Sequence, residues 1–292
     1  MSPAIEGVIT AMCTPFSEDG SVDERAARAL ARHLIDNGSH GVVVAGTTGE
    51  GTTLTDEEQI SLLKAVLDEI GTEAMVACGT GTNDTRHSCE LSAAAEQAGA
   101  HAVLVVTPYY NKPNRAGLLG HFAAVAGAVR CPVILYNIPS RCVINMPPEL
   151  LAELAQIDNV VAVKQANDDE LGPIEGLRIL AGNDTTFQRT LEFGGAGVIS
   201  VASQLVGNEM REQYDAAKAG DLDRAGEIDA RLQPFYQALG VTTNPIPVKA
   251  GLQLLGLASA RARLPMVEAD DAQRSVVREA LEAQGLLSGA PS

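Results

Sequence analysis

Short apolar runs alternate with longer amphipathic stretches along roughly the first 200 residues of the chain. The short runs are rich in valine and isoleucine, which is typical of strands buried on both faces. There are eight of them, and the predicted strands lie within residues 7–16, 41–48, 74–81, 101–110, 132–139, 160–166, 178–184 and 197–203.

The stretches between these runs have the periodicity of amphipathic helices. Residues 23–38 and 56–71 both begin with acidic side chains and end at glycine, which are the usual start and stop signals. Residues 88–100 and 115–129 repeat the pattern. Alternating strands and helices predict a parallel sheet. Eight such units favour a closed (β/α)8 barrel over an open doubly wound sheet, which more often has about five or six strands.

The strand pattern stops after about Ser203. Residues 209–239 and 244–258 are predicted to be helical, with Asn244-Pro245 at the start of the second segment. We therefore expect an α/β fold in two parts. A (β/α)8 TIM barrel covers residues 1–205, and a C-terminal helical appendage over residues 206–292 packs on the barrel.

Composition and charge narrow the classes of function. The 292 residues are 46% hydrophobic and 20% charged, as in ordinary globular proteins. A net charge of −16 argues against a nucleic-acid partner, and it requires an anionic substrate to find positive charge at particular side chains. The start lacks a signal-peptide pattern, no apolar run has the ~20 residues of a membrane span, and five cysteines without a CxxC pair suit a reducing compartment. We expect a cytoplasmic protein.

Active sites of such barrels gather at the carboxyl ends of the strands. The five histidines show no metal-binding spacing, so a cluster of imidazole ligands is not expected. The strand ends instead offer one amine, several hydroxyls and no carboxylate–histidine pair. The side chains in question are Thr14, Thr47, Thr48, Thr80, Thr107, Tyr109, Tyr110, Tyr136, Asn137, Lys164, Asn183 and Ser200.

Lys164 follows four apolar residues at the end of the sixth predicted strand. Among neutral hydroxyls and apolar walls an ammonium is poorly solvated, so the pKa of this amine should fall. A fall from ~10.4 to about 7–8 requires roughly 3 to 5 kcal/mol, which burial can supply, and the neutral amine is then a nucleophile for carbonyls. The alternative is that Lys164 extends to solvent or pairs with an acid.

Three further motifs each allow two interpretations. In "GTTGE", the turn that carries Thr47 and Thr48 could bind a small carboxylate, or it could be a plain strand-to-helix turn capped by Thr55 or Asp56. The tyrosines of "TPYYNKP" could relay protons or pack on a neighbour. Arg141 in "YNIPSRC" could hold a substrate carboxylate or be a solvated loop charge.

Together the motifs resemble the dihydrodipicolinate synthase / N-acetylneuraminate lyase family of class I aldolases. The resemblance covers nearly the whole chain, in the family's order and spacing. It is carried by "GTTGE", "GTGTND", "VTPYYNKP", "YNIPSR", "AVKQA", "AGND", "GGAGVISV" and "NPIPVK".

The resemblance implies a catalytic scheme. Lys164 matches the lysine that forms a Schiff base with pyruvate, and Tyr136 matches the tyrosine that moves protons. Thr47 and Tyr110 match the other members of a hydroxyl relay, with Tyr110 reaching in from a neighbouring subunit. The resemblance implies no cofactor and no metal, because the protonated Schiff base is itself the electron sink.

The same resemblance assigns the substrates. Thr48 matches the residue that binds the pyruvate carboxylate, with the backbone of Ile199 beside it, and Gly182 is expected among the substrate-binding residues. Arg141 matches the arginine that receives the carboxylate of L-aspartate 4-semialdehyde. The implied activity is condensation of these two molecules to 4-hydroxy-tetrahydrodipicolinate in lysine and diaminopimelate biosynthesis. The implied assembly is a homotetramer of tight dimers that share Tyr110.

The sequence departs from the family pattern in three places. Gln165 replaces a common glutamate beside the lysine, and Cys142 stands where the loop often has threonine. Where lysine-sensitive members carry two histidines and a glutamate, this chain has Asp56, Gln59 and His87. Loss of that glutamate removes a partner for a cation, so weak or absent inhibition by lysine is expected.

Two other functions stay open from the sequence. An aldolase that cleaves a keto-sugar acid, as N-acetylneuraminate lyases do, would share the same lysine and tyrosine. The "PSR" loop with Arg141 favours the condensing enzyme. A catalytically silent sensor of keto acids would be expected to lack Lys164 or Tyr136, and both are present.

Overall fold

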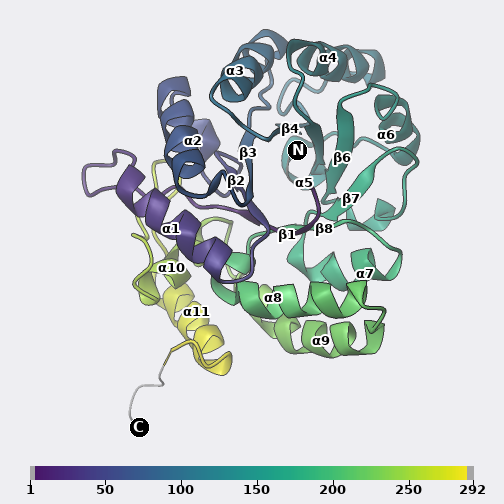
Figure 1. The fold of residues 1–292 in the computed structure, drawn as a ribbon. Helices are drawn as coiled ribbons and strands as arrows, with labels where there is room; N and C mark the ends of the chain where they lie inside the picture. The colour runs from purple at the N-terminus through teal and green to yellow at the C-terminus, as the bar shows by residue number, and fades with distance from the viewer. Residues whose placement is uncertain (1–3, 288–292) are drawn as a thin grey trace.

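The fold is a closed barrel of eight parallel strands in sequential order (Figure 1), so the predicted TIM barrel is confirmed. The computed structural model describes residues 4–287. Each strand lies inside one of the eight predicted runs. The strands are β1 (Gly7–Ala11), β2 (Gly41–Val44), β3 (Met75–Gly79), β4 (Ala102–Val106), β5 (Val133–Asn137), β6 (Val160–Gln165), β7 (Arg178–Ala181) and β8 (Gly197–Ser200).

The barrel closes where β1 pairs with β8, from Gly7 opposite Gly197 to Thr10 opposite Ser200. Gly197 has a φ of +148°, and a Cβ on it would lie 2.1 Å from the carbonyl oxygen of Gly7. Only glycine fits this seam, because the two backbones touch there.

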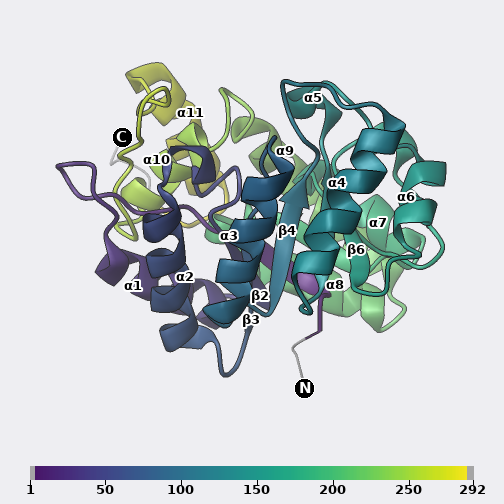
Figure 2. The ribbon, with the colours of Figure 1, turned by 90° about the horizontal axis from the view of Figure 1, so that it is seen from above.

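Helices surround the barrel, as Figures 1 and 2 show. Thr55 caps one of them with a capping box that includes Glu58, as the sequence suggested for this turn. The barrel helices are α1 (Glu24–Asp36), α2 (Asp56–Ile70), α3 (Thr85–Gln97), α4 (Arg115–Ala128), α5 (Pro139–Cys142), α6 (Pro148–Leu154), α7 (Phe187–Glu192) and α8 (Ser203–Lys218). Short 3-10 turns cover Gly51–Thr53, Asp168–Glu170 and Asp184–Thr186.

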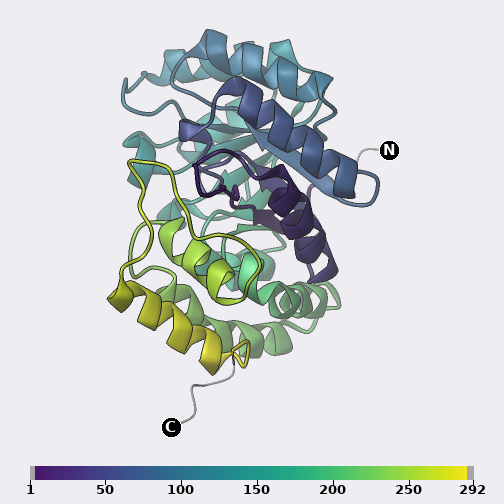
Figure 3. The ribbon, with the colours of Figure 1, turned by 90° about the vertical axis from the view of Figure 1, so that its left-hand side faces the viewer.

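Three further helices follow the barrel, namely α9 (Leu222–Ala238), α10 (Ile246–Leu254) and α11 (Asp271–Ala283). Figure 3 shows α10 and α11 on one flank of the molecule beside α8 and α9. The predicted division after residue 205 falls inside α8, which packs on β1. Because α8 completes the ring of barrel helices, we propose that the barrel extends to Lys218 and that the appendage begins with α9.

Strand side chains alternate between two apolar layers, one inside the barrel and one between the strands and the helices. On β6, Ala162 belongs to the inner layer and Val163 to the outer one. Lys164 therefore points into the barrel, and Gln165 points outward. No helix between residues 4 and 287 is both long and apolar enough to cross a membrane.

Candidate active site

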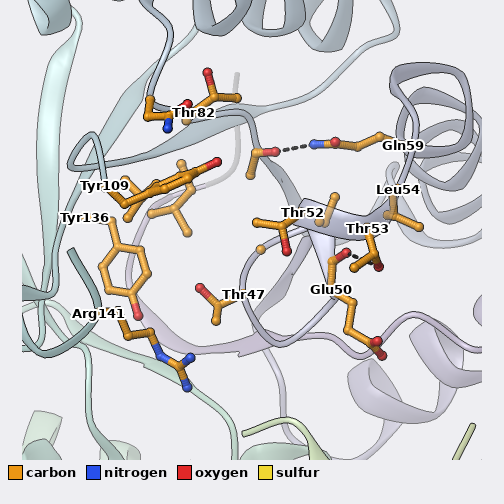
Figure 4. Close-up of a pocket in the computed structure, with 18 of the residues that line it drawn as sticks. Thr47, Glu50, Thr52, Thr53, Leu54, Gln59, Thr82, Tyr109, Tyr136 and Arg141 are labelled. Atoms are coloured by element: carbon orange, nitrogen blue, oxygen red, sulfur yellow. Dashed lines mark hydrogen bonds between the residues drawn. The ribbon is translucent and has the colours of Figure 1, made fainter. Parts of the chain in front are cut away.

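A cavity of about 410 Å³ opens at the carboxyl ends of the strands (Figure 4). Thr47, Tyr136 and Arg141 line it, together with Tyr109 and Asn244. Among the other predicted site residues, Lys164 and Thr48 lie behind this lining layer and are 4% and 3% exposed. The structure thus gathers side chains from β2, β5, β6 and the C-terminal segment at one mouth of the barrel.

Lys164 is buried, as the sequence predicted. Its Nζ lies 4.5 Å from the centroid of the Tyr136 ring, which belongs to the neighbouring strand β5. Burial lowers the pKa of Lys164 from 10.5 to about 8, while Asp184 opposes the shift and Arg141 adds to it. A substantial fraction of this amine is therefore neutral and nucleophilic near pH 8.

Tyr136 is 5% exposed, lines the cavity and lies beside the lysine. Burial raises the pKa of its phenol, and the nearby Arg141 charge and Thr47 hydroxyl counteract part of that rise. In Figure 4 the phenol oxygen points towards Thr47 and Arg141. A phenol in this position stays protonated at neutral pH and can donate a proton to a group bound at the lysine.

The turn after β2 carries the two threonines that the sequence singled out. Thr47 faces the cavity, whereas Thr48 is buried and its Oγ1 accepts a hydrogen bond of 2.9 Å from Asn244 Nδ2. The Thr14 hydroxyl donates to the carbonyl of Gly49 at 2.5 Å. The turn is therefore fixed on both sides, by the strand β1 region and by the C-terminal segment.

Arg141 lies on the short helix α5 and is exposed to the cavity. Its Nη2 donates to the backbone oxygen of Asn244 at 3.3 Å, and its remaining donors are available to an anion in the cavity. Cys142 beside it is 2% exposed and also lines the cavity, and burial raises the pKa of its thiol to about 11. This departure from the family pattern therefore contributes a neutral apolar surface to the pocket.

Ile199 and Gly182 lie deeper at the barrel mouth. Ile199 is fully buried on β8. Gly182 follows β7 and donates from its backbone to the carbonyl of Gln165 at 2.7 Å, and a Cβ there would lie 2.6 Å from the Cβ of Ala166. Close packing of two strand ends explains the glycine at position 182, and its predicted contact with substrate stays a prediction.

Tyr110 is a predicted site residue that the single chain leaves facing away from the barrel mouth, in solvent. Its side chain is 87% exposed, and its backbone has a φ of +73°, a left-handed conformation that non-glycine residues adopt only at a cost. The preceding Tyr109 lines the cavity instead, and burial raises the pKa of its phenol.

The structure also shows the surroundings of the other two departures from the family pattern, at Gln165 and at the group of Asp56, Gln59 and His87. The Oε1 of Gln165 accepts hydrogen bonds from Asn137 Nδ2 at 2.9 Å and from the backbone of Asn167 at 3.1 Å, on the outer face of the sheet. Gln165 therefore supports the strand end without facing the amine. At the far end of the cavity His87 Nε2 lies 2.9 Å from Asp56 Oδ1, and the amide of Gln59 donates to the backbone of Gly79.

Two contributors to the site were missed by sequence reasoning. Asn244 was interpreted only as a helix start, yet it contacts both Thr48 and Arg141. Glu50 appeared only as a letter of the "GTTGE" motif, yet its buried carboxylate contacts Lys249. A charged residue at position 249, in a segment otherwise apolar from Ile246 to Leu252, was the available signal.

The hydroxyl, amine and guanidinium groups of the site suit an organic anion better than a metal ion. Within residues 4–287, no three His, Cys, Asp or Glu side chains are grouped so that they could hold a metal ion. The five cysteines are all free thiols. A closed barrel with a buried amine beside a phenol at its carboxyl mouth is the arrangement expected of a (β/α)8-barrel enzyme that uses a lysine.

Comparison with known proteins gives the family. Residues 4–284 match the family described as "Dihydrodipicolinate synthetase family". A relative from Symbiobacterium thermophilum, named 4-hydroxy-tetrahydrodipicolinate synthase, is 45% identical over 292 residues, which cover 98% of this chain and 100% of the relative. The chain belongs to the dihydrodipicolinate synthetase family, and the resemblance inferred from its motifs is confirmed.

Solved structures agree over the whole fold. A dihydrodipicolinate synthase from Thermotoga maritima superimposes with a TM-score of 0.94 at 36% identity, covering 97% of this chain and 99% of the other. A chloride-inhibited dihydrodipicolinate synthase from Acinetobacter baumannii, complexed with pyruvate, gives 0.94 at 35% identity, with 97% and 100% covered. The chain is therefore similar to these lyases throughout its barrel and its C-terminal helices.

Proposed function

We propose that the chain is a 4-hydroxy-tetrahydrodipicolinate synthase, which condenses pyruvate with L-aspartate 4-semialdehyde. Full-length relatives at 43–45% identity carry that name. The observation that supports the chemistry best is the buried Lys164, whose pKa is lowered to about 8 beside the Tyr136 phenol. The function needs an amine that is partly neutral near pH 8 and a proton donor beside it, and Lys164 and Tyr136 fit these two requirements.

The first half of the reaction uses Lys164 as the nucleophile. Its neutral Nζ attacks the ketone carbon of pyruvate, and loss of water leaves a protonated imine. The Tyr136 phenol, with Thr47 as its neighbour, donates the proton that lets the hydroxyl leave as water. Thr48 and the backbone beside Ile199 are proposed to hold the pyruvate carboxylate.

The second half forms the ring. A methyl proton of the imine is lost to give an enamine, whose carbon attacks the aldehyde of the second substrate. The amino group of that substrate then attacks the imine carbon, closes the ring and releases Lys164, so that one water is formed overall. Arg141 is exposed to the cavity and is proposed to bind the carboxylate of the aldehyde substrate by charge-assisted hydrogen bonds. This arginine favours the synthase over an aldolase for keto-sugar acids.

The exposed position of Tyr110 supports a proposal about the oligomeric assembly. An aromatic side chain that is 87% exposed on a left-handed backbone is unfavourable in an isolated chain. We propose that Tyr110 reaches the site of a neighbouring subunit in a tight dimer, two of which form a tetramer. Analytical ultracentrifugation of wild type and Tyr110→Ala tests this. A monomer with full activity would contradict it.

A coupled assay tests the substrate. With pyruvate and L-aspartate 4-semialdehyde the protein should turn over at an ordinary enzymatic rate of about 1–10³ s⁻¹. With N-acetylneuraminate it should release no pyruvate above background. Turnover of the sugar acid without condensation of the semialdehyde would overturn the proposal in favour of the related aldolase.

A further inference from the structure

Beneath the threonine turn lies a buried ion pair between two distant parts of the chain. Glu50 closes the turn after β2, and Lys249 belongs to α10 in the C-terminal part. Their side chains are 2% and 1% exposed, and Lys249 Nζ contacts Glu50 Oε1. Figure 4 shows the Glu50 carboxylate pointing away from Thr47 and the cavity. Glu50 thus borders the cavity, while its carboxylate is buried against Lys249.

The backbone at Glu50 would be better served by glycine. Its φ is +54°, in the left-handed region, and Gly49 and Gly51 flank it. Glutamate is disfavoured in this conformation, so the contacts of its side chain must offset the strain of the left-handed backbone. The Glu50 backbone also accepts hydrogen bonds from the amide and the hydroxyl of Thr53, at 2.9 and 3.0 Å.

A C-terminal strap completes the enclosure of this carboxylate. The strap comprises residues 261–263. The backbone N–H of Arg263 donates to Glu50 Oε2 at 2.9 Å, and Lys249 Nζ donates to the carbonyl of Arg261 at 2.7 Å. The Lys249 ammonium and the Arg263 guanidinium both lie over the ring of Phe16. Lys249 Nζ and Arg263 Cζ are 4.4 and 4.6 Å from its centroid.

The guanidinium of Arg263 fixes the strap to the same helix that follows the turn. It binds both oxygens of Glu58, at 2.7 and 2.6 Å, and donates to the carbonyl of Thr53 at 2.9 Å. Glu58 is the capping-box residue of α2. The strap, α10 and the start of α2 therefore hold one short loop from three sides.

A buried ion pair is a poor source of stability, because the loss of hydration opposes the attraction of the charges. Its directional contacts can still fix one arrangement of the backbone. We infer that Glu50 and Lys249 are positioning residues that hold the Thr47–Thr48 turn in the geometry that binds the pyruvate carboxylate. This inference rests on the proposed function, since it assigns the turn to pyruvate.

The test removes the charges while keeping the packing. Lys249→Met should raise the KM for pyruvate about tenfold, with kcat and the KM for L-aspartate semialdehyde within about threefold of wild type. Hydrogen exchange in a peptide covering residues 44–54 should become faster. The control is Lys64→Met, which removes an exposed lysine of α2 and should change none of these quantities.

The double variant Glu50→Gln/Lys249→Met separates positioning from folding, because it leaves no unpaired buried charge. It is also the variant to assay if Lys249→Met does not fold. The double variant should regain much of the folding stability that Lys249→Met loses. It should still show the raised KM for pyruvate and the faster hydrogen exchange. A double variant with wild-type KM and wild-type exchange would overturn the inference. Wild-type protein that does not condense pyruvate at all would instead overturn the proposed function, and this inference with it.

Discussion

Lys164 and Tyr136 are partners in register on the adjacent strands β6 and β5, and the lysine Nζ lies 4.5 Å from the centroid of the phenol ring. The β-ladder therefore fixes the spacing between the proposed nucleophile and the proposed proton donor without help from a mobile loop. Each side chain is at most 5% exposed, so water competes poorly for either group. The rigid pairing and the dryness are the two conditions that an imine-forming lysine needs.

The lowered pKa of Lys164 has a consequence for stability. Because the folded pKa is about 8 and the unfolded value is near 10.5, the unfolded chain binds a proton more tightly between these pH values. This group therefore destabilises the fold at pH 7, and stability rises with pH from about 8 to about 10.5. Lys164→Met should therefore be more stable than wild type at pH 7 by about 3 kcal/mol, at 1.36 kcal/mol per pKa unit.

Urea unfolding of wild type and Lys164→Met at pH 7 and at pH 10 measures this difference. The gain should shrink strongly at pH 10, because there the wild-type amine is neutral in the folded protein and the unfolded chain has begun to lose its proton. A variant less stable than wild type at pH 7 would contradict a desolvated amine.

Removal of the Tyr136 hydroxyl should slow turnover while sparing the fold. Positioned proton transfer contributes about 10²–10⁴-fold, so Tyr136→Phe should lose that much in kcat. The ring stays in place, and the thermal midpoint should move little. Tyr214→Phe is the matched control, because Tyr214 is a buried phenol on α8 that packs edge-on against His40. Equal losses in the two variants would remove the proposed role of Tyr136.

Replacement of Arg141 should act on one substrate only. Hydrogen bonds to charged groups contribute about 1.5–3 kcal/mol, so Arg141→Met should raise the KM for L-aspartate semialdehyde roughly 10- to 150-fold. The KM for pyruvate should stay within about twofold. Arg86→Met is a suitable control, because the Arg86 side chain is 84% exposed. If the pyruvate KM rises as much as the other, Arg141 does not select the second substrate.

The barrel and the catalytic strand ends could be predicted because they follow from local pattern. Apolar runs and helix signals located every strand, and the position of Lys164 after four apolar residues correctly predicted a buried amine with a lowered pKa. Of the two caps considered for α2, Thr55 and Asp56, the structure has Thr55. These features depend on neighbours within a few residues of sequence.

Features that depend on distant contacts were not predicted. Asn244 Nδ2 and the Thr48 hydroxyl are 196 residues apart in sequence, and Arg263 and Glu50 are 213 apart, so no local signal joins them. The boundary after residue 205 was placed where the strand pattern ends. It falls inside α8, which begins at Ser203 and packs on β1. Gln165 points away from the amine because neighbouring residues of a strand face opposite sides of the sheet. This rule could have predicted its direction from the sequence.

Inhibition by L-lysine should be weak or absent. At the end of the cavity that carries Asp56, Gln59 and His87, the imidazole contacts the Asp56 carboxylate and the Gln59 amide is engaged with Gly79. A neutral amide at position 59 offers no charge to an ammonium group. Initial rates with up to about 10 mM lysine measure this, at saturating and at limiting pyruvate. An inhibition constant below about 1 mM would show that the remaining groups suffice.

The central claim is that Lys164 is the amine that bonds covalently to pyruvate. Borohydride reduction in the presence of pyruvate, followed by peptide mass mapping, tests it most directly. The account predicts one reduced pyruvate adduct per chain, on the peptide that contains Lys164, and none in Lys164→Met. An adduct on Lys249 or any other lysine, or no adduct while the wild-type enzyme turns over, would contradict it.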